Sequence, residues 1–157
     1  MPITLAPLNI IAASEIMALH NHPKVRRHLP LAQGEFELTT YHNWLTSKED
    51  LWNNYGYGPW AILIEEQFAG WGGFQSENDD ADFGLVLKPE YWGFGKRIYQ
   101  MMEFIAIHDF KLESITALLP LSRGQTRTME RLGFSADGHL CLTGITFRRW
   151  RKTIGTH

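Results

Sequence analysis

A strand, a glycine-containing turn and a long helix follow one another in the middle of the chain, and this segment constrains the fold most strongly. The apolar run Phe83 to Leu87 has the length and composition of a buried strand. Pro89 ends it, because proline cannot donate to a sheet ladder. After Gly93 and Gly95, apolar residues recur on neighbouring helical faces from Lys96 to Phe110, which indicates a helix covered on more than one side. The chain therefore contains an α/β unit.

The start of this predicted helix has the features of an anion site. The first N–H groups of a helix lack partners within it, and together with the macrodipole they favour a ligand such as phosphate. Lys96 and Arg97 lie in the first turn, where a cation opposes the dipole by roughly 0.3 to 1 kcal/mol, so a bound polyanion would relieve the conflict. A simpler interpretation stays open, in which Gly93 and Gly95 only shape a tight turn and both cations are solvated.

Two other phosphate-binding folds are disfavoured by their missing residues. The third glycine of a dinucleotide-binding GxGxxG motif would fall on Ile98. The GxxxxGK[ST] phosphate loop does not occur anywhere in the sequence. A Rossmann enzyme and a P-loop enzyme are therefore both disfavoured.

The remaining segments predict a mixed α/β sheet with an antiparallel first half and one crossover helix. Helices are expected at Ser14 to His20, where Ser14 can cap, at Phe36 to Trp52 and at Gln125 to Leu132; strands are expected at Trp60 to Ile64, Phe68 to Phe74, Ile115 to Leu119 and twice after Phe134. An acidic loop at 77–80 should precede the strand that begins near Asp82. No repeat or linker is visible, so we expect one domain over residues 1–157.

Composition excludes several classes of protein. The chain has 157 residues, 44% of them hydrophobic, and a net charge of −2, so nothing draws it globally to nucleic acid or anionic lipid. Cys141 is the single cysteine, which excludes intramolecular disulfides and thiolate-rich zinc sites and favours a reducing compartment. No basic leader and no membrane-spanning apolar run is present. We expect a cytoplasmic protein that contacts no membrane.

Three motifs, in the right order and spacing, resemble the GCN5-related N-acetyltransferase (GNAT) superfamily, and most closely its branch of ribosomal-protein N-terminal acetyltransferases. They are Trp92-Gly93-Phe94-Gly95 after a strand, the later Met129-Glu130-Arg131-Leu132-Gly133-Phe134, and the early Asn21-His22-Pro23-Lys24-Val25-Arg26-Arg27-His28-Leu29. The resemblance implies a GNAT-like mixed, mostly antiparallel sheet of about six or seven strands, flanked by helices and splayed after the fourth strand.

The resemblance also implies a function, namely transfer of an acetyl group from acetyl-CoA to a primary amine by direct attack in a ternary complex. The acceptor would be a small molecule or a peptide N-terminus. The implied cofactor-binding residues are Leu85, Val86 and Leu87 for the pantetheine arm, Trp92, Gly93, Phe94, Gly95, Lys96, Arg97 and Ile98 for the pyrophosphate, and Gln125. Ser122 stands where relatives often have an Asn near the pantetheine, and it is a candidate catalytic residue together with Asp82.

Asp82 is the candidate general base, because relatives often carry a Glu near that position and the attacking amine must lose a proton. Glu77, Asp79 and Asp80 are reserves that would act through water. Each of these four carboxylates could equally be a solvated loop residue. As a group they could attract a cationic amine.

Two departures from the family pattern leave an alternative open. Arg97 stands where the phosphate turn usually ends in Gly or Ala, so it either meets a CoA phosphate or crowds the turn, and we favour the first because guanidinium suits phosphate. Met129 replaces the Tyr that often protonates the thiolate, so no general acid is identified. A catalytically degenerate protein that binds acyl-CoA or a partner is the alternative.

The histidines and the cationic C-terminal stretch could indicate a metal site or a nucleic-acid contact, but ordinary structural roles explain them better. His20, His22 and His28 lack carboxylates at ligand spacing, so we expect no metal. The stretch Phe147 to Lys152 has the composition of a nucleic-acid contact, but a final strand with alternate residues in solvent explains it better at this net charge. We therefore expect no nucleic-acid partner. The sequence leaves open whether the protein is a monomer or a homodimer.

Overall fold

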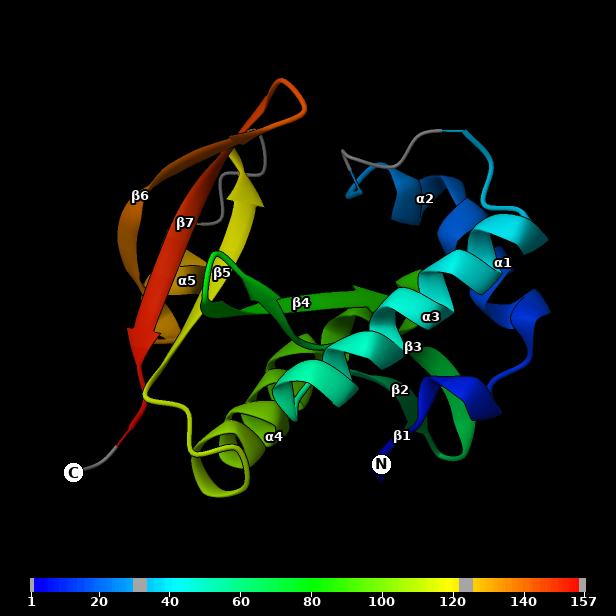
Figure 1. Ribbon diagram of the computed structural model, residues 1–157, viewed down its shortest axis with the longest axis horizontal. Helices are drawn as coiled ribbons and strands as arrows, with labels where there is room; N and C mark the ends of the chain where they lie inside the picture. Colours follow the sequence, from blue (N-terminus) through cyan, green and yellow to red (C-terminus); the bar gives the residue numbers. More distant parts are fainter. Residues whose placement is uncertain (1, 30–33, 122–125, 156–157) are drawn as a thin grey trace.

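The computed structural model describes residues 2–29, 34–121 and 126–155, which form one seven-stranded sheet with helices on both faces (Figure 1). The elements are β1 (Ile3–Ala6), η1 (Leu8–Ile10), α1 (Ala13–Asn21), α2 (Pro23–Arg26), α3 (Leu38–Tyr55), β2 (Pro59–Ile64), β3 (Gln67–Glu77), β4 (Asp80–Leu87), η2 (Pro89–Phe94), α4 (Gly95–His108), β5 (Ser114–Pro120), α5 (Thr126–Arg131), β6 (Ser135–Leu142) and β7 (Ile145–Thr153). The strand order is β1-β2-β3-β4-β5-β7-β6, and only the β4–β5 pair is parallel. The predicted mixed, mostly antiparallel sheet is confirmed.

The parallel pair between β4 and β5 is very short. It consists of Asp82 opposite Thr116 and Phe83 opposite Ala117. Beyond these two positions β4 continues to Leu87 while remaining paired with β3, and β5 continues to Pro120 while remaining paired with β7. The two halves of the sheet therefore separate after the fourth strand, as expected from the family resemblance (Figure 1).

Each face of the sheet carries its own core. Ile98, Met102 and Ala106 of α4 pack with Phe74 of β3 on one face. On the other face, Trp71 and Val86 pack with apolar side chains of α1 and α3, among them Ile16, Leu19 and Tyr41. Because side chains alternate along a strand, β4 serves both cores, with Val86 on the α1/α3 face and Leu85 and Leu87 toward α4.

Some predicted boundaries were wrong for local reasons. The N-terminal strand β1, which pairs with β2, was missed because its four residues Ile3–Ala6 are too few to show alternation. The expected acidic loop at 77–80 is a two-residue hairpin turn, since Asn78 and Asp79 adopt positive φ (51° and 67°). Strand β4 therefore begins at Asp80, two residues before Asp82. Ser14 lies inside α1 and does not cap it.

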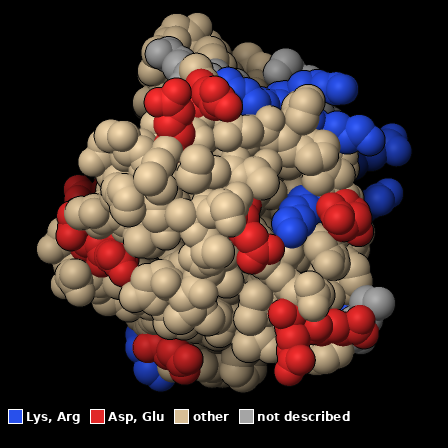
Figure 2. All heavy atoms as spheres, turned by 90° about the vertical axis from the view of Figure 1, so that its right-hand side faces the viewer, with Lys and Arg blue, Asp and Glu red and all other residues tan. Residues whose placement is uncertain are grey.

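On the face shown in Figure 2, charged side chains of both signs are present. Figure 2 shows the α1–α3 side of the molecule, where acidic side chains form several separate groups and basic ones gather toward one upper edge. A wide area between them carries neither. Within the described part of the chain, no helix is long and apolar enough to cross a membrane.

The close approach of β3 to β4 yields a first prediction. Gly70 has φ +155°, and a Cβ there would lie 2.1 Å from the Val86 carbonyl oxygen. Gly70→Ala should therefore lower the free energy of unfolding by about 2 to 3 kcal/mol, measured by urea titration. Gly93→Ala is the matched control, since a Cβ at Gly93 meets no atom within 4 Å. Equal stability of the two variants would contradict the strand packing described above.

Candidate active site

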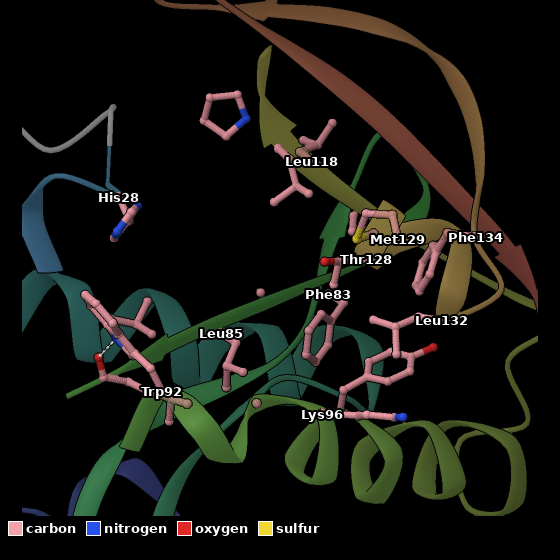
Figure 3. Close-up of a pocket in the computed structure, with 18 of the residues that line it drawn as sticks. His28, Phe83, Leu85, Trp92, Lys96, Leu118, Thr128, Met129, Leu132 and Phe134 are labelled. Atoms are coloured by element: carbon pink, nitrogen blue, oxygen red, sulfur yellow. Dashed lines mark hydrogen bonds between the residues drawn. The ribbon is translucent and has the colours of Figure 1, made fainter. Parts of the chain in front are cut away.

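The separation of β4 from β5 opens a cleft of about 790 Å³. One wall consists of β4 from Gly84 to Leu87, and the opposite wall of β5 from Ala117 to Pro120. Figure 3 shows His28 and Trp92 on one side of the cleft and Leu118, Thr128 and Met129 on the other. The cleft is thus bounded by segments from α2, η2 and α5 as well as by the two strands.

The wall formed by β4 presents main-chain groups to the cleft. A Cβ at Gly70 or Gly72 of β3 would meet the carbonyl oxygens of Val86 and Gly84, so those carbonyls point toward β3. Successive residues of a strand direct their N–H and C=O groups to opposite sides, so those of Leu85 and Leu87 point into the cleft. Leu85 and Leu87 therefore have the orientation needed to pair with an extended ligand. The main chain of Val86 faces β3 instead.

Trp92 already occupies part of this edge. Its indole Nε1 donates a 2.9 Å hydrogen bond to the Leu87 carbonyl oxygen, and its ring is 45% exposed at the cleft. A carbonyl oxygen has a second lone pair, so this bond does not prevent Leu87 from accepting another donor. Trp92 instead ties the end of β4 to η2, the segment that leads to the helix.

The turn before α4 has space for a ligand to approach its backbone. The 3₁₀ helix η2 runs directly into α4, and the Gly95 N–H donates to the Trp92 carbonyl oxygen. A Cβ at Gly93 would meet nothing within 4 Å, and one at Gly95 would only touch Leu85 Cδ2 at 3.8 Å. Neither glycine has a positive φ. Protein packing therefore does not require glycine at either position, whereas a ligand lying against the turn would.

The two cations of the first helical turn lie differently. Lys96 lines the cleft, while the Arg97 guanidinium lies over the Phe94 ring with 5.8 Å from Cζ to the ring centroid. Arg97 therefore does not plug the cleft, which removes the crowding that its position suggested. The Ile98 side chain is fully buried against the sheet, so only its main chain could contact a ligand.

Asp82 lies where β4 and β5 still pair, directly before Phe83 and Gly84, which line the cleft. Thr116 Oγ1 donates a 2.8 Å hydrogen bond to Asp82 Oδ1. Burial raises the pKa of Asp82 to about 7; the Thr116 hydrogen bond opposes this rise, and the charges of Glu77 and Asp80 add to it. A carboxyl group that titrates near neutrality can accept a proton as a general base at physiological pH.

The comparisons with known proteins agree with this geometry. The model of the family described as "Acetyltransferase (GNAT) domain" matches residues 3–135. The chain belongs to the GNAT acetyltransferase family. It is thus an acetyltransferase that uses acetyl-CoA as co-substrate and an amine as acceptor. Family membership does not favour the catalytically degenerate alternative.

Solved structures of acetyltransferases share the fold at low sequence identity. Spermidine N-acetyltransferase from Vibrio cholerae, in complex with CoA and spermine, matches with a TM-score of 0.76 and 15% identity over 97% of this chain and 95% of that one. An acetyltransferase from Agrobacterium tumefaciens matches with a TM-score of 0.75 and 16% identity over 95% of this chain and 89% of that one. A GNAT-family acetyltransferase from Bacillus anthracis matches with a TM-score of 0.73 and 15% identity over 98% of this chain and 95% of that one. No curated protein sequence matched the chain.

The acidic residues near Asp82 have separate roles in this GNAT domain. Asp80 forms a bidentate ion pair with Arg151, with Nη1–Oδ1 at 2.9 Å and Nη2–Oδ2 at 3.0 Å. The same guanidinium donates through Nε to Asp137. Asp80 is therefore a structural link between β4 and the β6–β7 hairpin, and it is poorly placed as a reserve base. Glu77 and Asp79 are exposed at the hairpin turn.

The candidate general acid is still missing from the described residues. Met129 is buried and lines the cleft, at the place where the superfamily often has Tyr. Tyr99 also lines the cleft, but its hydroxyl donates to Glu103, and burial together with this contact raises its pKa. Ser122 and Gln125 lie outside the described residues. The sequence analysis did not identify Thr116 as the partner of Asp82; the only indication in the sequence was a hydroxyl side chain within the apolar run of β5.

A polar cluster on the α1/α3 face of the sheet was also missed. Lys48 Nζ donates a 2.6 Å hydrogen bond to Gln75 Oε1 and lies 5.1 Å from the centroid of the Trp71 ring. Burial lowers the pKa of Lys48 to about 8. His20 accepts a 3.1 Å hydrogen bond from Trp71 Nε1, and burial, followed by the charge of Lys48, lowers its pKa to about 4. These residues are far apart in sequence, so no local pattern could reveal the cluster.

The cationic stretch of the last strand is largely neutralised within the fold. Arg149 and Arg151 pair with Asp137, and Lys152 Nζ lies 2.6 Å from Glu103 Oε2. Phe147 and Trp150 are buried. Three of the four cations of this stretch are therefore paired with carboxylates, and Arg148 lies over the Trp150 ring instead. In the ranges that the structure describes, no three His, Cys, Asp or Glu side chains gather as a metal site.

The hydrogen bond to Asp82 yields a second prediction. In Thr116→Val the Asp82 pKa should rise above its value of about 7, because the hydrogen bond that favours the charged carboxylate is lost. Thr116→Ser keeps a hydroxyl and should restore the original value. Carboxyl ¹³C NMR titration measures both, with Asp82→Asn to assign the signal. An unchanged pKa in Thr116→Val would show that Thr116 does not act on this carboxylate.

Proposed function

We propose that residues 1–157 form a single N-acetyltransferase domain that acetylates a primary amine of a small molecule or a peptide N-terminus, with direct attack on acetyl-CoA in a ternary complex. The observation that carries this proposal is the position of Asp82, a carboxyl with a pKa near 7, directly before Phe83 and Gly84 of the cleft. The β4 wall of the same cleft presents the main-chain groups of Leu85 and Leu87. The single cysteine supports a cytoplasmic location.

Acetyl-CoA would lie along β4 and end at the turn before α4. The main chains of Leu85 and Leu87 are oriented to pair with the pantetheine arm as an added strand. The turn from Trp92 to Ile98 would hold the pyrophosphate through backbone N–H groups, with Lys96 at the cleft and Arg97 beside it. Val86 would contribute only its apolar side chain to the wall of the cleft, because its main chain faces β3. The bound co-substrate supplies the activated acetyl group.

A residue of the chain would then accept the proton that the acceptor amine loses. Asp82 accepts the proton that the amine nitrogen loses as its bond to the acetyl carbon forms and the carbon–sulfur bond breaks. CoA leaves with the electron pair of that bond and takes a proton from solvent. Thr116 holds Oδ1 of Asp82, which orients the other carboxylate oxygen. Ser122 remains a candidate catalytic residue from the sequence alone.

Two classes of acceptor are compatible with the family. The structurally similar Vibrio cholerae enzyme is a spermidine N-acetyltransferase, which suggests a polyamine. The Asn21 to Leu29 motif resembles ribosomal-protein N-terminal acetyltransferases, which suggests a peptide N-terminus. Both acceptors present a primary or N-terminal amine to the same base, so the proposed chemistry is common to both.

A third prediction concerns co-substrate binding. Arg97→Glu should weaken CoA binding by about tenfold or more, because it replaces a cation beside the pyrophosphate with an anion. Lys111→Glu makes the same change in charge on an exposed residue beyond the other end of α4 and should leave the affinity unchanged. Isothermal titration calorimetry measures both. Unchanged affinity in Arg97→Glu would remove Arg97 from the site, and no CoA binding by the unmodified protein would overturn the proposed function.

A fourth prediction concerns the base. Asp82→Asn should lower kcat by roughly 10² to 10⁴, the usual contribution of a positioned general base. In the unmodified protein the activity should rise with pH through about 7, because only the deprotonated Asp82 accepts a proton. Glu66→Gln, which changes an exposed carboxylate in the turn between β2 and β3, serves as control and should keep both properties. Thiol release from acetyl-CoA measures the rates, and an Asp82→Asn variant with full activity would exclude this residue as base.

A further inference from the structure

Gln75 and Asp82 form a directly opposed pair on adjacent antiparallel strands. Their Cα atoms are register partners in the β3–β4 ladder, so both side chains lie on the same face of the sheet. The next pair, Phe74 and Phe83, belongs to the core that packs on α4. Gln75 and Asp82 therefore point to the opposite face, toward α1 and α3. The bond from Lys48 of α3 to Gln75 confirms this orientation.

Lys48 fixes which end of the Gln75 amide lies toward Gly84. An ammonium group can only donate, so the atom 2.6 Å from Lys48 Nζ must be the carbonyl oxygen Oε1. The amide nitrogen Nε2 then points the other way, and it lies 3.7 Å from the position that a Cβ at Gly84 would occupy. Gly84 lines the cleft. Gln75 thus places its N–H donors beside Gly84, a cleft residue that has no side chain to cover them.

Next to this pair, the same face of β3 and β4 carries first two glycines without side chains and then two apolar side chains. Gly73 lies opposite Gly84, and Trp71 lies opposite Val86, one step further along the same face. Gly84, Val86 and Trp71 all line the cleft. A molecule lying on this face would therefore meet apolar walls along its length and the Gln75–Asp82 pair at one end.

The two side chains of the pair differ in hydrogen-bonding character. Asp82 offers an acceptor and Gln75 a donor, with Cβ atoms about 4.5 to 5.5 Å apart in such a pair. An amino group next to a carbonyl presents the complementary order, namely an N–H donor and an oxygen acceptor separated by two carbon atoms. A polyamine presents donors only, and one of them would face Nε2. The arrangement therefore distinguishes the two acceptor classes.

We propose that Gln75 determines acceptor specificity by donating from Nε2 to the carbonyl or carboxylate oxygen adjacent to the reacting amine, so that the acceptor is an α-amino carbonyl compound. This inference rests on the proposed function and assigns its substrate class. Lys48 is the positioning residue, because its ammonium orients and polarises the Gln75 amide. Its charge also disfavours a second cationic group in the acceptor.

The surroundings of Lys48 support this role. No carboxylate of a described residue lies within ion-pair distance of Lys48 Nζ; its contacts are Gln75 and the faces of Trp71 and Trp44, at 5.1 and 6.0 Å from the ring centroids. A partly buried ammonium without an opposite charge nearby costs free energy. An acceptor oxygen bound to Gln75 would bring negative charge toward it.

The test compares acceptors through thiol release from acetyl-CoA. Three probes are used at equal concentration: an equimolar pool of L-amino-acid amides, a pool of primary alkylamines with the same side chains but no carbonyl group, and spermidine. The unmodified protein should acetylate the amide pool fastest. Gln75→Leu should lower the amide-to-alkylamine rate ratio by about tenfold, since the donor is lost. Comparing ratios between variants cancels the different basicities of the amines.

A second variant reverses the character of the site. In Gln75→Glu one carboxylate oxygen pairs with Lys48 and the other replaces the Nε2 donor with an acceptor, so the rate with spermidine should rise relative to the amide pool. Gln67→Leu is the matched control, an exposed glutamine at the start of the same strand. It should change neither ratio. Circular dichroism and calorimetry with CoA show that each variant is folded and still binds the co-substrate.

The outcomes separate the inference from the proposed function. Unchanged ratios in both Gln75 variants, or faster acetylation of spermidine than of the amide pool by the unmodified protein, would overturn the inference and leave the acetyltransferase proposal intact. CoA binding without thiol release from any probe would also overturn the inference. Failure to bind CoA would overturn the proposed function itself.

Discussion

The two-residue parallel pairing between β4 and β5 is the constraint on which the rest of the structure depends. Thr116 opposite Asp82 and Ala117 opposite Phe83 join the halves of the sheet, and among the described residues β4 and β5 pair at no other position. Asp80 and Arg151 brace the same junction from the side of β7. Because the strands part immediately afterwards, the Leu85 and Leu87 edge of β4 has no strand partner, and this edge is the wall along which we propose that acyl-CoA binds.

Strand β4 serves three environments because successive side chains point to opposite faces of the sheet while successive main-chain groups point to opposite edges. Val86 enters the α1/α3 core, Leu85 and Leu87 face the α4 core, and the amides of the same two leucines face the cleft. One register therefore fixes both the packing of the sheet and the orientation of the ligand edge. A shift of one residue would expose Val86 and turn the Leu85 and Leu87 amides toward β3, so the stability of the fold and the geometry of the site depend on the same register.

Local patterns made the strand, turn and helix around Gly93 and Gly95 predictable, together with the cations in the first turn and the carboxylate at Asp82. The missed features depend on contacts distant in sequence. Thr116 reaches Asp82 over 34 residues, Lys48 reaches Gln75 over 27, and Arg151 reaches Asp80 over 71. Asp80, taken from the sequence as a reserve base, proved to be an ion-pair partner for this reason. No spacing rule reveals which carboxylate of an acidic turn will be paired.

Electrostatics divides the cleft into two ends with different tasks. At the α4 end, Lys96 and the helix N-terminus favour negative charge, which suits a diphosphate. At the junction of β4 and β5, burial keeps Asp82 near the midpoint of its titration, so it can take a proton without a permanent negative charge that would trap an ammonium. Lys48 lies behind Gln75 on the same side and works against a second cation. The residues around Asp82 thus favour a neutral, attacking amine with an oxygen beside it, and this is the form in which an amine can react.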